Sequence, residues 1–131
     1  MLTLSAVRGS TAGWLGPRYS RRLGDQGRRP DGVLVATDKS WSIDDLRLNF
    51  QFSCEIAWEI KHGRRTRILR DPFYTGLTPE LWGSCDAVCD ARDWRLWGIT
   101  SCGKGDPMQV MHVGHGASPA RFRGVTVGSA S

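Results

Sequence analysis

The residues best suited to chemistry lie near the end of the chain, in the segment Thr100-Ser-Cys-Gly-Lys-Gly-Asp-Pro107. Cys102 is followed by a glycine, so little backbone bulk blocks an approaching ion, and Lys104 favours the thiolate, the form that binds metal. We expect this cysteine in an exposed, flexible turn. Cys102 is therefore a candidate metal ligand, and an ordinary loop cysteine is the alternative.

A structural zinc site is a second way to combine the potential ligands of the chain. It would use three cysteines and two histidines: Cys85, Cys89, Cys102, His112 and His115. Their spacing matches no established zinc module. The three-residue gap between Cys85 and Cys89 also differs from the two-residue gap of zinc knuckles and redox motifs. These two cysteines are better interpreted as small core residues.

Complete catalytic constellations are missing from the sequence. No histidine is followed by glutamate, which excludes HExxH and HExxxH within the chain. There is no GxSxG nucleophile elbow and no Walker loop, and no GxGxxG joins a strand to a helix. The residues of this chain therefore assign no catalytic side chain.

The elements around these residues are predicted to be mainly β. A short strand is expected at Gly32–Ala36. From Leu46 to Ile60 apolar residues occupy the even positions and mostly polar residues the odd ones. This period of two is typical of a strand with one buried face. Fifteen residues is long for a strand, so we expect a bulge or bend within it.

Turn and helix signals follow this strand. The sequence Lys61-His-Gly-Arg64 predicts a hairpin turn leading to a strand at Thr66–Arg70. Thr78-Pro-Glu80 predicts a helix start, with Thr78 as the cap. The expected buried helix face comprises Leu81, Trp82, Cys85, Val88 and Cys89. Two or three further strands are expected near 94–99, 108–113 and 120–127.

The charge of the chain is concentrated at its start. Residues 1–30 contain six arginines and one acid, whereas residues 31–131 contain twelve basic and twelve acidic residues. We interpret residues 1–30 as a basic, largely disordered leader. A neutral body argues against a nucleic-acid-binding protein. The sequence has no membrane span and no secretory signal pattern, so we expect a cytoplasmic protein.

Four motifs resemble the TldD/PmbA metallopeptidase family. They cover about residues 31–128 in order. They are the strand from Asp38-Lys-Ser-Trp-Ser-Ile-Asp to Glu55, the turn Asp71-Pro-Phe-Tyr-Thr-Gly76, the block Cys102-Gly-Lys-Gly-Asp-Pro107, and Val113-Gly-His-Gly-Ala-Ser-Pro-Ala-Arg-Phe-Arg123. The leader has no counterpart in the family.

The resemblance implies a fold and a role. It implies an antiparallel, barrel-like C-terminal domain of TldD type with one short helix. Such enzymes cleave flexible peptides as a pair of TldD and TldE (PmbA) subunits. One metal ion, zinc or iron, is held by two histidines of an HExxxH helix and by a C-terminal cysteine that corresponds to Cys102.

This chain departs from the family pattern because the HExxxH helix is absent. We therefore expect a C-terminal fragment that supplies one ligand and part of the peptide-binding site. It would be inactive without an HExxxH-bearing N-terminal TldD domain and a TldE/PmbA-like subunit. The alternative is a non-catalytic remnant or partner-binding module of the same fold.

Overall fold

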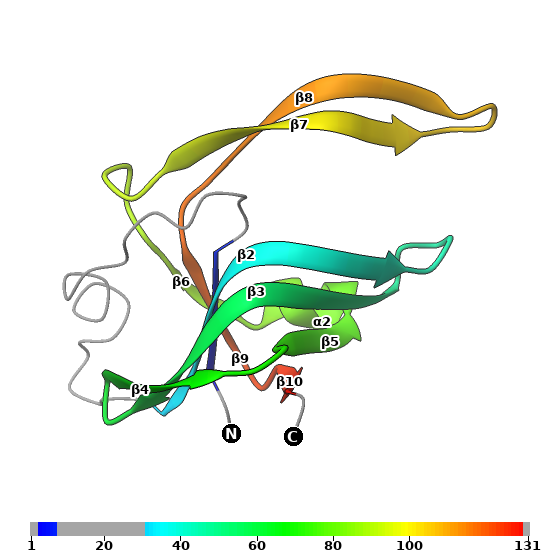
Figure 1. Cartoon of the computed structure of the whole chain (residues 1–131). Coiled ribbons are helices and arrows are strands. Elements are labelled where there is room, and N and C mark those ends of the chain that lie inside the picture. Colours follow the sequence, from blue (N-terminus) through cyan, green and yellow to red (C-terminus); the bar gives the residue numbers. More distant parts are fainter. Residues whose placement is uncertain (1–2, 8–30, 130–131) are drawn as a thin grey trace.

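The computed structural model of the chain describes residues 3–7 and 31–129 (Figure 1). These described residues are mainly β, with largely antiparallel pairing and one short helix, which confirms the predicted fold class. The elements are β1 (Thr3–Val7), β2 (Gly32–Ile43), β3 (Asn49–Lys61), β4 (Arg64–Leu69), β5 (Phe73–Leu77), α2 (Thr78–Gly83), β6 (Cys85–Val88), β7 (Arg95–Lys104), β8 (Gln109–Ala117), β9 (Ala120–Arg123) and β10 (Thr126–Gly128).

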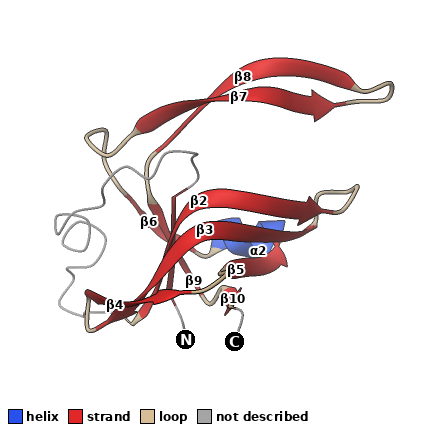
Figure 2. Ribbon diagram, viewed as in Figure 1, coloured by secondary structure: helices blue, strands red, loops and turns tan. Residues whose placement is uncertain are grey.

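Eight strands form one open sheet, in the order β10-β5-β3-β2-β1-β9-β6, with β4 paired to β3 outside this path. Strands β7 and β8 form a separate two-stranded sheet that stands away from the main one (Figure 2). The described part of the main sheet does not close into a barrel. Helix α2 lies against one face of the main sheet, behind β3 in this view.

The central pairing joins β2 to β3. On β3, Phe50, Phe52 and Cys54 are buried in the main apolar cluster, as the alternation predicts. Beyond Cys54 the buried residues no longer have even numbers, because Ala57 is fully buried in the same cluster. The expected irregularity lies in the partner strands: Lys39 of β2 is an extra residue between two paired neighbours, and β4 shifts register opposite Glu59.

The prediction was wrong at the start of the alternating segment. Leu46 is 88% exposed and Leu48 is also exposed, because both belong to the turn that precedes β3. The Asp44 carboxylate accepts hydrogen bonds from the backbone N–H groups of Leu48 and Asn49. Arg47 has a φ of 58° within this turn. An aspartate that binds the nearby backbone competes with strand pairing here.

The predicted hairpin turn is confirmed, with positive φ at both His62 and Gly63. The strand that follows begins two residues earlier than expected, at Arg64. The closing strands are longer than expected in β7 and β8. The segment 120–127 divides into β9 and β10 at Gly124, which has a φ of 65°.

The helix is shorter than predicted. It ends at Gly83, and Cys85–Val88 forms strand β6, which pairs with β9. The predicted face extending to Cys89 is therefore wrong, because partners distant in the sequence draw this segment into the sheet. Thr78 is not the side-chain cap: its Oγ1 donates to the carbonyl oxygen of Arg47, 2.8 Å away.

Strand β1 belongs to the segment interpreted as a disordered leader. It pairs in parallel with β2 and antiparallel with β9, so these five residues depart from that expectation. The rest of the leader, residues 8–30, lies outside the described part of the chain. In the described residues no helix is long and apolar enough to cross a membrane, and the cytoplasmic location stays a prediction.

Candidate functional site

Cys102 lies on β7, next to a break in the pairing with β8. Ile99 pairs with Val113 and Cys102 pairs with Met111, so two residues of β7, at positions 100 and 101, lie opposite one residue of β8. That single residue is His112, whose Nδ1 donates to the carbonyl oxygen of Thr100. Bulges of this kind redirect side chains and occur often beside functional sites.

The structure corrects the expected surroundings of Cys102. The residue lies in a strand and is half-buried, whereas the turn of the hairpin is at residues 105–108. Its thiol is free. A strand fixes the direction of a side chain better than a flexible turn would, because successive side chains alternate between the two faces. The candidate ligand therefore has a defined orientation.

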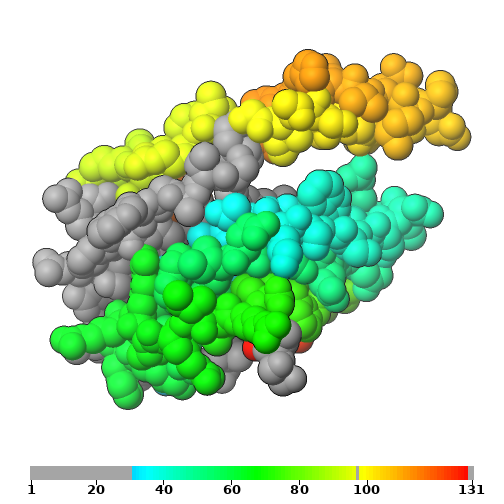
Figure 3. Space-filling model, viewed as in Figure 1, coloured from blue at the N-terminus to red at the C-terminus, as the bar shows by residue number. Residues whose placement is uncertain are grey.

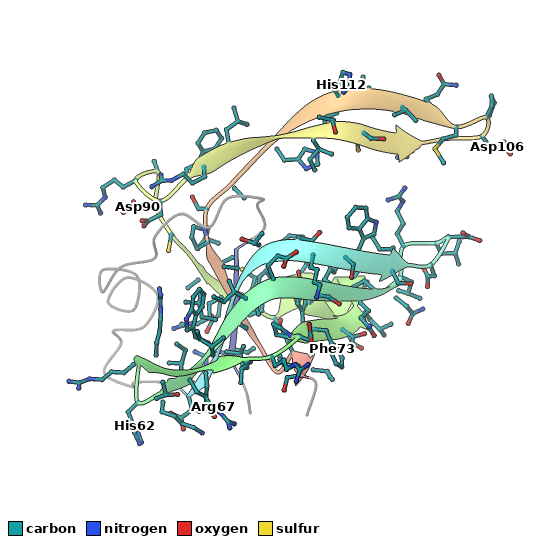
Figure 4. All side chains as sticks on the ribbon, viewed as in Figure 1. His62, Arg67, Phe73, Asp90, Asp106 and His112 are labelled. Carbon is teal, nitrogen blue, oxygen red and sulfur yellow. The ribbon has the colours of Figure 1, made fainter. Side chains whose placement is uncertain are left out.

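The other potential ligands do not join Cys102. His112 follows Met111, the pairing partner of Cys102, so it lies on the opposite face of the hairpin. Figure 4 shows His112 on the side turned away from the main sheet. His115 shares the Met111 face but lies four positions along the strand, about 13 Å away at the usual rise per residue. Cys85 lies on β6 and Cys89 directly follows this strand, in the other part of the fold.

The structure does not bring the five residues of the alternative zinc site together. Within residues 3–7 and 31–129, no three histidine, cysteine, aspartate or glutamate side chains are grouped so that they could hold a metal ion.

The β7–β8 hairpin, which carries Cys102, borders an open space. The distal part of the β7–β8 hairpin stands clear of β2, and Figure 3 shows an open cleft between them. Leu96, Val110 and Met111 on the hairpin are exposed apolar residues. A two-stranded hairpin is at best marginally stable in water unless something packs on it. The hairpin is therefore suited to contact another protein segment.

The four thiols differ in accessibility. Cys54 and Cys89 are buried, whereas Cys85 and Cys102 are half-buried. Burial raises the pKa of Cys54 to about 12, and the nearby Asp38 adds to this effect. The Cys85 thiol is directed to the carbonyl oxygen of Ala87, at 3.8 Å.

We expect an alkylating reagent to modify Cys102 and Cys85 in the folded protein at pH 8, and Cys54 and Cys89 only after denaturation. The thiolate is the reactive form, and burial withholds both access and ionisation. Mass-spectrometric mapping of the labelled peptides measures this order. Early modification of Cys54 would contradict its position in the core.

The Cys54 thiol makes the stability of the fold depend on pH. Because its pKa is about 12 when folded and about 9.0 in its unperturbed state, the unfolded chain loses this proton first as the pH rises. The contribution of Cys54 to stability is therefore complete below pH 9 and decreases between pH 9 and 12.

A second feature of the fold is a cavity of about 410 Å³ beside α2, which the sequence did not predict. Its lining comes from the end of β2, from β3 and β5, from α2 and β6, and from the β8–β9 connection with β9. No local motif marks such a site, because its residues meet only through the sheet.

Asp86 of β6 receives hydrogen bonds from Arg121 and Arg123 of β9, which hold its pKa below the ordinary value and join these two strands.

No protein-family model matches this chain, and no curated protein matches it.

Proposed function

We propose that this chain is the C-terminal part of a TldD-type metallopeptidase and that it contributes Cys102 as one metal ligand. The observation that carries the proposal is the position of this thiol, which a bulged strand orients on a hairpin beside an open cleft. The four family-like motifs, in family order, support the same assignment.

The described residues do not fit a complete metal site. A catalytic zinc site needs three protein ligands and an open position for water, whereas the described residues contain no group of three side chains that could hold a metal ion. Of these residues we assign only Cys102 to the metal. The remaining ligands and the catalytic glutamate would come from an HExxxH-bearing N-terminal TldD domain, with a TldE/PmbA-like subunit completing the enzyme. The metal would be zinc or iron, and the substrate an unstructured peptide.

A non-catalytic module is the second candidate. The exposed apolar residues of the hairpin, Leu96, Val110 and Met111, favour a partner-binding surface even if no metal is ever held. The two candidates share the fold and the partner surface. They differ in whether the thiol of Cys102 contributes to activity.

We expect the isolated chain to show no peptidase activity, with or without added zinc or iron. Adding an HExxxH-bearing TldD fragment and a TldE-like subunit should produce peptide cleavage that a chelator abolishes. The Cys102→Ala chain should restore little or none of it, because a thiolate ligand cannot be replaced by a methyl group. Cleavage of a fluorogenic unstructured peptide measures each combination.

The matched control is Cys85→Ala, which removes a half-buried thiol from the other part of the fold. It should support cleavage like the unaltered chain. Chelator-sensitive cleavage by the isolated chain would contradict the proposed incompleteness. Cleavage that survives Cys102→Ala would remove this residue from the ligands and favour the non-catalytic module.

A further inference from the structure

The lining of the cavity beside α2 is mainly apolar. Five aromatic residues belong to this lining: Phe50, Phe52, Tyr74, Trp82 and Phe122. The first three contact one another at centroid distances of 5.5–6.0 Å, and Trp82 meets Phe122 edge to face at 5.8 Å. Four of these residues are buried even though the cavity adjoins them. A volume of about 410 Å³ is in the range of small-molecule pockets.

The lining also contains polar residues, Arg47 and Thr78 among them. Among the described residues of the lining Arg47 is the only charged one, and Thr78 donates a hydrogen bond to its carbonyl oxygen. The backbone of Arg47 is held from the other side as well, because its N–H donates to the carbonyl oxygen of Asp44 at 2.8 Å. The exposed guanidinium makes no ion pair with any residue in the described ranges, whereas the Asp44 carboxylate is already engaged by Leu48 and Asn49.

The aromatic lining and the guanidinium together define the complementary ligand. A ligand with an apolar chain would bury that chain against the aromatic residues. An anionic group at the end of the same ligand would pair with the guanidinium of Arg47. One guanidinium matches one carboxylate in a two-point contact. We propose that this cavity binds a medium-chain alkyl carboxylate, with the chain on the aromatic residues and the carboxylate at Arg47. This site is independent of Cys102 and of the proposed peptidase role.

The experiment titrates the full chain calorimetrically with octanoate and decanoate below their micellar concentrations. Decanoate should bind with one-to-one stoichiometry. Each methylene added to the ligand should lower the dissociation constant by about fourfold, as long as that methylene still contacts apolar surface. Decanol, which has the same body without the charge, should bind about tenfold more weakly than decanoate.

Two variants test the charged and the apolar contacts separately. Arg47→Gln should weaken decanoate about tenfold and leave decanol unchanged, whereas Arg64→Gln, at the distant β3–β4 turn, should change neither. Leu81→Trp adds bulk to the lining and should reduce the binding of both ligands. Circular dichroism of each variant checks that the fold is retained.

Several results would overturn the proposal. The first is that decanoate does not bind. The second is that the Leu81→Trp chain binds decanoate as tightly as the unaltered chain. The third is that Arg47→Gln and Arg64→Gln weaken the binding of decanoate by the same factor. Binding of a blocked peptide that ends in leucine, without binding of decanoate, would also overturn it and identify a peptide carboxyl terminus as the occupant. None of these outcomes depends on peptidase activity, so the two proposals fail separately.

Discussion

Replacing Phe50 by alanine should lower the free energy of unfolding by about 3–5 kcal/mol. Phe50 is 5% exposed, lies in the main apolar cluster of the sheet and contacts the rings of Phe52 and Tyr74. Truncation removes these contacts and enlarges a space that rigid strands cannot fill. Urea denaturation followed by circular dichroism gives the change in midpoint and slope.

The neighbouring residue provides the control. Gln51 lies on the same strand with its side chain exposed, and Gln51→Ala should change stability by no more than about 0.5 kcal/mol. Equal shifts of the unfolding midpoint in the two variants would contradict the assignment of the buried face of β3.

Replacing Ala57 by aspartate should unfold the protein. Ala57 is 0% exposed and pairs with Val35 on one side and Leu69 on the other, so the carboxylate would enter an apolar, closely packed position. Burial of an unpaired charge costs about 4–5 kcal/mol or more, a large part of the stability of an ordinary domain. Loss of dispersed amide signals in a nitrogen–proton NMR spectrum is the expected result.

Ala91→Asp is the same change at an exposed turn position and should preserve the spectrum. A folded Ala57→Asp protein with unchanged stability would mean that position 57 reaches solvent, and the proposed pairing of β2, β3 and β4 would need revision.

The sequence predicted elements whose signals are local. The period of two placed Phe50, Phe52 and Cys54 in the core, and His62-Gly63 predicted the hairpin turn. It misplaced Leu46 and Leu48, because side-chain hydrogen bonds of Asp44 decide that turn. The helix was extended into Cys85–Val88 because the competing partner, β9, lies more than thirty residues later in the chain.

That Cys102 binds a metal stays a prediction, and its position in the fold could not be predicted from the sequence. A motif singled out Cys102, whereas the bulge beside it depends on pairing with β8. The cavity was not predictable at all, since Arg47, Tyr74 and Phe122 come from separate segments that only the assembled sheet brings together. The periodicity of a sequence predicts which face of a strand or helix is buried. It does not predict where the packing of those faces leaves a cavity.

The position of β1 has a consequence for how the chain reaches this fold. Its partners are β2, which follows it, and β9, which comes almost at the end of the chain. During synthesis one edge of β1 must therefore stay without its partner until β9 has emerged, and unpaired edges invite association with other chains. Contacts between such distant segments also slow folding. The pairing of β9 therefore comes late in folding. A chain that ended before Ala120 would lack the strand that lies between β1 and β6 in the main sheet.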